Sequence, residues 1–117
     1  MIRQNNEKGS VNVSTNVYTD IAGTAASNCF GVKGMVARNV SDGLYHLLRK
    51  ESMSKGVKIT HNEDDSVSIE LHIIVDNGVN LMAVSRSIQS EVKYHVNRLT
   101  NVEVRSVDVC IDSMVIG

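Results

Sequence analysis

The chain has 117 residues, of which 42% are hydrophobic and 21% are charged, and its formal net charge is -1. This length is enough for one packed core and too short for two ordinary domains, so we expect a single domain over residues 1–117. The near-neutral balance excludes an overall positive field that would attract nucleic acid or an anionic membrane.

The N-terminal sequence MIRQNNEKGS is polar and lacks the apolar segment of a secretory signal. No later stretch approaches the run of about 20 apolar residues that crosses a bilayer. We therefore expect a cytoplasmic protein without direct membrane insertion, in which residues 1–8 are flexible. The two cysteines, Cys29 and Cys110, lie far apart in the sequence and in no metal-spaced motif, so we expect them to be reduced.

Two elements are predicted before residue 29. Val11 and Val13 alternate with polar residues, which is typical of a short half-buried strand over residues 10–14. Apolar residues then recur at helical spacing and predict a helix over residues 15–28, with Ser14 or Thr15 as its N-cap.

A loop over residues 29–35 follows this helix. It contains two glycines three positions apart, which predict a tight turn with at least one residue at positive φ. A second, shorter helix is predicted next, because Ser41 and Asp42 are cap candidates and an apolar edge follows them. That edge consists of Leu44, Leu47 and Leu48. Polar residues 49–56 are interpreted as a connection.

Two strands and a hairpin loop are predicted after this connection. The first strand begins at Val57, and the charged residues 61–65 form the loop. The second strand, over residues 66–75, has the clearest alternation in the chain. Its apolar face consists of Val67, Ile69, Leu71, Ile73 and Val75. One face of the sheet is therefore expected to be covered by helices and the other to be partly wet.

The longest predicted helix covers residues 79–99. Its apolar stripe is formed mainly by Leu81, Met82, Val84, Ile88, Val92, Val96 and Leu99. A final strand starts at residue 102. Its apolar residues change from even-numbered to odd-numbered positions along the strand, which predicts a bulge around Arg105-Ser106. The order is β-α-(α)-β-β-α-β. We predict an α+β two-layer sandwich, with a small, mostly antiparallel sheet and helices on one face, similar to a split βαβ arrangement.

No catalytic, cofactor-binding or metal-binding cluster is predicted. The four histidines are scattered without a metal-spaced pair: His46, His61, His72 and His95. His72, beside Glu70 on the wet face of its strand, is interpreted as a solvated surface residue. Residues 63–65 are acidic but lack the ligand spacing of a calcium loop.

One short motif leaves an alternative open. Gly31, Val32, Lys33 and Gly34 form a GxxG sequence with a basic residue, followed by Met35. In KH domains such a loop between two helices clamps a nucleic-acid backbone. Aromatic residues make up only 3% of the chain, which leaves no stacking platform for bases. A structural turn is the favoured interpretation, so nucleic-acid binding is not expected, and a KH-like nucleic-acid-binding module is the alternative.

Four segments carry a family resemblance. They read GSVNVSTNVYTDIAGTAASNCFGVKGM at 9–35, SDGLYHLLRKESMSKGVKI at 41–59, SIELHIIVDNGVNLMAVSRSIQSEVKYHV at 68–96 and NVEVRSVDVCI at 101–111. Together they resemble the alkaline shock protein and Gls-type general stress protein family of Gram-positive bacteria, especially its YloU-like branch. The chain departs from the family pattern at Thr15, where many relatives have proline.

The resemblance implies a cytoplasmic protein linked with the envelope stress response and without enzyme activity. It also implies homo-oligomeric assembly, a membrane-anchoring protein partner in some relatives, and a possible link to a fatty acid kinase that is often encoded nearby. We therefore expect a non-enzymatic scaffold or regulatory protein of envelope homeostasis. Its predicted interaction surfaces are the turn over residues 31–35, the wet face of the sheet, and the apolar end Met114, Val115 and Ile116.

Overall fold

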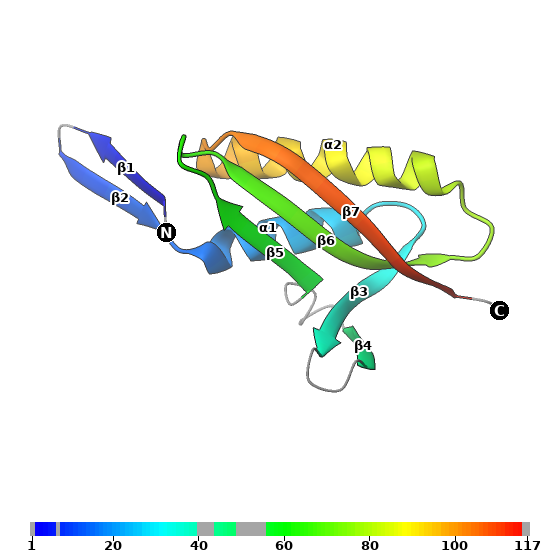
Figure 1. The fold of residues 1–117 in the computed structure, drawn as a ribbon. Helices are drawn as coiled ribbons and strands as arrows, with labels where there is room; N and C mark the ends of the chain where they lie inside the picture. Colours follow the sequence, from blue (N-terminus) through cyan, green and yellow to red (C-terminus); the bar gives the residue numbers. More distant parts are fainter. Residues whose placement is uncertain (1, 7, 40–43, 49–55, 116–117) are drawn as a thin grey trace.

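The computed structural model of the chain describes residues 2–6, 8–39, 44–48 and 56–115. Within these residues two helices cover a five-stranded sheet, and a separate two-stranded hairpin precedes them (Figure 1). The elements are β1 Ile2–Asn6, β2 Gly9–Val13, α1 Thr15–Ser27, β3 Val32–Asn39, β4 Leu44–Leu48, β5 Val57–His61, β6 Val67–Asp76, α2 Leu81–Thr100 and β7 Val104–Val115. The predicted small α+β fold is confirmed.

Strand β6 is the centre of the sheet. Along one edge it pairs in parallel with β7. Along the other it pairs antiparallel with β5 over residues 67–71 and with β3 over residues 73–75. Strand β3 then continues into an antiparallel pair with β4. The parallel strands β6 and β7 are direct neighbours joined through α2, whereas a split βαβ arrangement would place another strand between them.

Both helices lie on one face of the sheet (Figure 1). The alternation in β6 turns its apolar side chains toward them, and all five predicted core residues of this strand are buried. Helix α1 contributes Tyr18 and small residues such as Ala22 and Ala26, which are fully buried. These small side chains let α1 lie close to α2, with which it is in contact.

Helix α2 buries a narrower stripe than the sequence predicted. Its buried residues are Val84, Ile88, Val92, Val96 and Thr100. They lie four positions apart, and Thr100 continues this row while its hydroxyl donates to the Val96 carbonyl oxygen at 2.6 Å. Leu81, Met82 and Leu99 lie outside the row and are exposed, with 66% of Leu99 accessible to solvent.

The predicted second helix is wrong. Residues of β3 and β4 form an antiparallel pair instead, with Met35 opposite Leu48 and Asn39 opposite Leu44. A short apolar run such as 44–48 fits a helix edge and a strand equally well, and pairing with β3 decides between them. The proposed caps Ser41 and Asp42 lie outside the described residues, as do residues 49–55 of the predicted connection.

The predicted bulge in the last strand is confirmed. Val67 lies opposite Val104 and Ser68 lies opposite Ser106, so Arg105 is the extra residue. A second irregularity, which the sequence did not predict, follows Ile111, where Asp112 is the extra residue in the same strand.

The hairpin of β1 and β2 differs from expectation. Residues 1–8 were expected to be flexible, but Ile2–Asn6 forms a strand that pairs antiparallel with Gly9–Val13. Figure 1 shows this hairpin projecting from the sandwich, joined to it through the start of α1.

A helix that spans a membrane must be both long and apolar. In the described part of the chain, neither helix is both long enough and apolar enough to span a bilayer.

Candidate functional site

The turn after α1 has the positive φ that its glycines predicted. Gly31 has a φ of +88°, and its carbonyl oxygen accepts a hydrogen bond from the Asp76 amide at 2.8 Å. A Cβ atom on Gly31 would lie 3.1 Å from Val79 Cγ1 and 3.2 Å from Val84 Cγ2. Glycine is therefore needed both for the backbone conformation and for the close approach to α2.

The rest of the GxxG motif lies in a strand. Val32, Lys33 and Gly34 begin β3, and Met35 is fully buried in the core. Lys33 Nζ lies 3.3 Å from Asp76 Oδ1, so this cation already has an anionic partner. The KH-like interpretation required a loop between two helices, and that premise is wrong because a strand follows α1.

The structure brings the two predicted interaction segments together. Val32 and Met114 lie on opposite sides of Val75 in β6, one in the antiparallel pair and one in the parallel pair. The turn and the apolar end of β7 therefore lie at the same end of the sheet, on either side of β6. Of the predicted assembly end, Met114 and Val115 are exposed, and Ile116 lies outside the described residues.

Phe30 adds a large aromatic side chain to this place, with 89% of its surface exposed. A groove of about 630 Å³ runs beside it, with Val79 and Val115 among its lining residues. We call Phe30, Lys33, Asp76, Met114 and Val115 the strand-end surface. Sequence reasoning named three of its members and missed Phe30 and Asp76, because their proximity depends on how β3 and β7 pair with β6.

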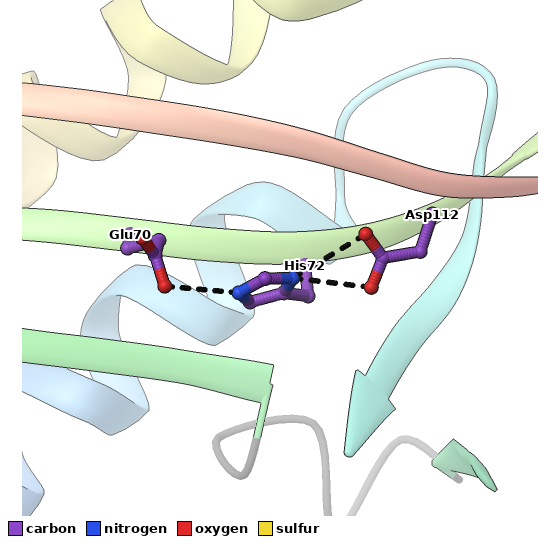
Figure 2. A network of polar contacts seen from close by, with 3 residues as sticks. All are labelled: Glu70, His72 and Asp112. Atoms are coloured by element: carbon purple, nitrogen blue, oxygen red, sulfur yellow. Dashed lines mark hydrogen bonds and ion pairs between the residues drawn. The ribbon is translucent and has the colours of Figure 1, made fainter. Parts of the chain in front are cut away.

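A second group of side chains gathers on the sheet face opposite the helices. His72 Nε2 lies 3.0 Å from Glu70 Oε2, and His72 Nδ1 lies 3.1 Å from Asp112 Oδ2. Figure 2 shows the imidazole between the two carboxylates, with Glu70 and His72 on β6 and Asp112 on β7. The side chains of His72 and Asp112 are 14% and 15% exposed, and that of Glu70 is 42% exposed.

Cys110 belongs to the same group. It lies opposite His72 in the parallel pair, and its sulfur, an imidazole nitrogen of His72 and a carboxylate oxygen of Glu70 all lie within 4.8 Å of one another. We call Glu70, His72, Cys110 and Asp112 the polar cluster. The sequence contains Glu-x-His and Cys-x-Asp, but only the register between β6 and β7 joins them, so interpreting His72 as a solvated residue missed this group.

The other histidines whose side chains are described lie elsewhere. His61 Nε2 lies 3.0 Å from Thr15 Oγ1, and burial lowers the pKa of His61. His95 Nε2 lies 3.2 Å from Glu91 Oε2 on the surface of α2. The side chain of His46 is outside the described part.

Comparison with known proteins gives close relatives along almost the whole chain. The chain is 36% identical over 107 residues to uncharacterized protein YloU of Bacillus subtilis, a match that covers 91% of this chain and 88% of that protein. It is 28% identical over 114 residues to uncharacterized protein Spy1614 of Streptococcus pyogenes serotype M6, covering 97% of this chain and 93% of that protein. No solved structure matches the chain.

A protein-family match agrees with these relatives and confirms the resemblance found in the sequence. Residues 3–116 match the family of alkaline shock protein 23, which is described by its cell envelope-related function. The chain therefore belongs to the alkaline shock protein 23 family, a family with a cell envelope-related function.

Proposed function

We propose that this protein is a non-enzymatic scaffold or regulatory protein of the cell envelope, and that it works by protein–protein interaction and self-assembly. The observation that carries the proposal is the strand-end surface, where Phe30, which is 89% exposed, lines a groove together with Val115. Burying a large apolar side chain such as Phe30 contributes about 1.5–3 kcal/mol. Aromatic residues and methionine are also enriched in the buried centres of protein interfaces.

A second copy of this chain is the occupant that we propose for this surface. Lys33 and Asp76 provide one charge of each sign next to the apolar residues. Such a surface suits a two-fold dimer, because Lys33 and Asp76 offset each other's charge and leave no net charge beside the apolar residues. The formal net charge of -1 also gives little repulsion between copies.

Light scattering after size-exclusion chromatography tests the assembly. We expect the wild-type mass to rise toward twice that of one chain as concentration increases, and Phe30→Ser to shift the equilibrium toward the monomer. Leu99→Ser is the matched control, because Leu99 is also exposed but lies at the far end of the 20-residue helix α2. A wild-type protein that stays monomeric at all concentrations contradicts the proposal, as does a dimer that Phe30→Ser leaves intact.

A cellular experiment tests the envelope role. In bacteria that lack the gene, we expect wild-type protein and the Leu99→Ser variant to restore resistance to envelope-damaging agents, and Phe30→Ser to fail.

We further propose that the protein is cytoplasmic and is held at the membrane by an anchoring protein. Cell fractionation with and without that partner checks this part. A monomer that binds only the anchoring protein through Phe30 argues against the second copy as occupant.

A further inference from the structure

Three kinds of donor atom meet on the open face of β6 and β7. Glu70 offers a carboxylate oxygen, His72 an imidazole nitrogen and Cys110 a sulfur, all within 4.8 Å of one another. Zinc binds such atoms at about 2.0–2.3 Å, so its ligands lie about 3.5 Å apart in a tetrahedral site. The group thus needs side-chain shifts of about 1 Å, and not a backbone rearrangement, to hold an ion.

Asp112 gives His72 the orientation that a metal ligand requires. Its carboxylate lies 3.1 Å from Nδ1, which leaves Nε2 as the nitrogen that faces Glu70. Histidines that bind metals usually donate their other N–H group to a carboxylate or carbonyl. Asp112 lies two positions after Cys110 and so points to the same open face, and the irregularity after Ile111 leaves it with no residue of β6 directly opposite.

Nε2 and Glu70 Oε2 lie close enough for one ion to contact both atoms. When Nδ1–H donates to Asp112, a neutral imidazole directs the lone pair of Nε2 at a carboxylate oxygen only 3.0 Å away. A proton on Nε2 satisfies this pair. A metal ion would instead bond to a nitrogen, an oxygen and a sulfur that already lie within 4.8 Å of one another.

We infer that Glu70, His72 and Cys110 form a binding site for a divalent transition-metal ion of the zinc class, and that Asp112 is its positioning residue. Mixed nitrogen, sulfur and oxygen ligands suit zinc, whereas magnesium and calcium take oxygen ligands. Three protein ligands leave a fourth position for water or for a group from another molecule. This inference is independent of the strand-end surface, and it replaces the expectation that the chain has no metal site.

Cobalt(II) is a direct probe of the site, because it substitutes for zinc and shows a sulfur-to-metal absorption band when a thiolate binds it. We expect the untagged full chain to give this band with one cobalt per chain, and zinc to abolish it by displacement. Cys110→Ser should remove the band. Cys29→Ala is the matched control and should keep it, because Cys29 is buried in the core.

Zinc affinity, measured by competition with a chromophoric chelator, tests the other residues. Glu70→Gln and His72→Gln should each weaken binding at least tenfold, and Asp112→Asn should weaken it about 10–100-fold while keeping the cobalt band. His95→Gln is the control for histidine loss, since His95 pairs with Glu91 on α2, and it should leave the affinity unchanged. Circular dichroism establishes that each variant is folded.

Several outcomes would overturn the inference. One is a folded wild-type chain that gives no cobalt band, and another is a band that survives Cys110→Ser or disappears in folded Cys29→Ala. A third is a protein in which NMR detects a proton on His72 Nε2 that zinc does not displace. Each of these would show that Glu70, His72 and Cys110 do not bind the ion together.

Discussion

Glycine is required at position 31 for two reasons, which are its backbone conformation and the lack of space for a side chain. Its φ of +88° lies in the left-handed region, and Val79 and Val84 occupy the space that a side chain would need. Gly78 has a similar φ of +86° but has no atom within 4 Å of the position of a Cβ. A comparison of substitutions at the two glycines therefore separates the free-energy cost of the backbone conformation from the free-energy cost of close contact.

Replacing each glycine by alanine measures the two costs. Gly78→Ala should lower the free energy of unfolding by about 1–2 kcal/mol, because the left-handed conformation is unfavourable for an L-residue. Gly31→Ala should lower it by more, since the new methyl group also presses on Val79 and Val84. Urea unfolding of both variants checks this order. Equal losses would show that the neighbouring valines yield freely.

The sequence could predict the positive φ in this turn, because glycine spacing carries that information locally. It could not predict the polar cluster. His72 and Asp112 lie 40 residues apart, and they meet because β7 pairs with β6 in the register that places Cys110 opposite His72. The backbone conformation of a residue within a turn could thus be predicted from the sequence. Contacts between side chains on different strands could not.

At the scale of elements, α2 shows how periodicity defines a helix more reliably than its buried face. The predicted stripe included both Ile88 and Leu99, but Ile88 is fully buried and Leu99 is 66% exposed. The row of residues four positions apart is buried in the core, and Leu99 lies outside this row near the C-terminal end of the helix, where it is exposed. The error in β3 and β4 has a related cause, because short apolar runs acquire their structure from the strand with which they pair.

Alanine substitution distinguishes the two faces of α2. Ile88→Ala should reduce the free energy of unfolding by about 2–5 kcal/mol, because it leaves a cavity in the core. Leu99→Ala should change it by no more than about 0.5 kcal/mol, since an exposed side chain contributes little. Chemical denaturation of both variants provides the measurement. A large loss for Leu99→Ala would mean that this end of the helix is covered in solution.

The whole molecule buries two weak acids in its helical layer. Burial raises the pKa of Tyr18 above its ordinary value of 10.0, although the nearby Thr100 hydroxyl partly opposes the shift. Burial also raises the pKa of the Cys29 thiol above its ordinary value of 9.0, against a smaller opposing effect of Ser87. Both groups stay neutral in the folded chain at pH values at which they ionise in the unfolded chain.

These shifts predict a loss of stability in alkali. The folded state holds protons that the unfolded state releases, so the contribution is complete below about pH 9 and is lost as the pH rises toward the folded pKa values. The double variant Tyr18→Phe Cys29→Ala should flatten the decline of unfolding free energy above pH 9. Tyr94→Phe, a change at an exposed tyrosine, should leave the decline as it is. An unchanged slope in the double variant contradicts this account.

The overall layering was predictable because the alternation in β6 and the long helical period of α2 are strong local signals. The partners with which the strands pair were harder to predict. The parallel contact of β6 with β7 and the antiparallel contact with β3 join segments that are distant in sequence, and they depend on how the whole sheet closes.

Synthesis on the ribosome proceeds from β1 toward β7, and the parallel edge of β6 can be filled only by the last of the described strands. Until β7 emerges from the exit tunnel, the apolar faces of β6 and α2 have no complete layer in which to pack, and the nascent chain presents them to chaperones. The five-stranded sheet is therefore complete only once β7 is available to pair with β6.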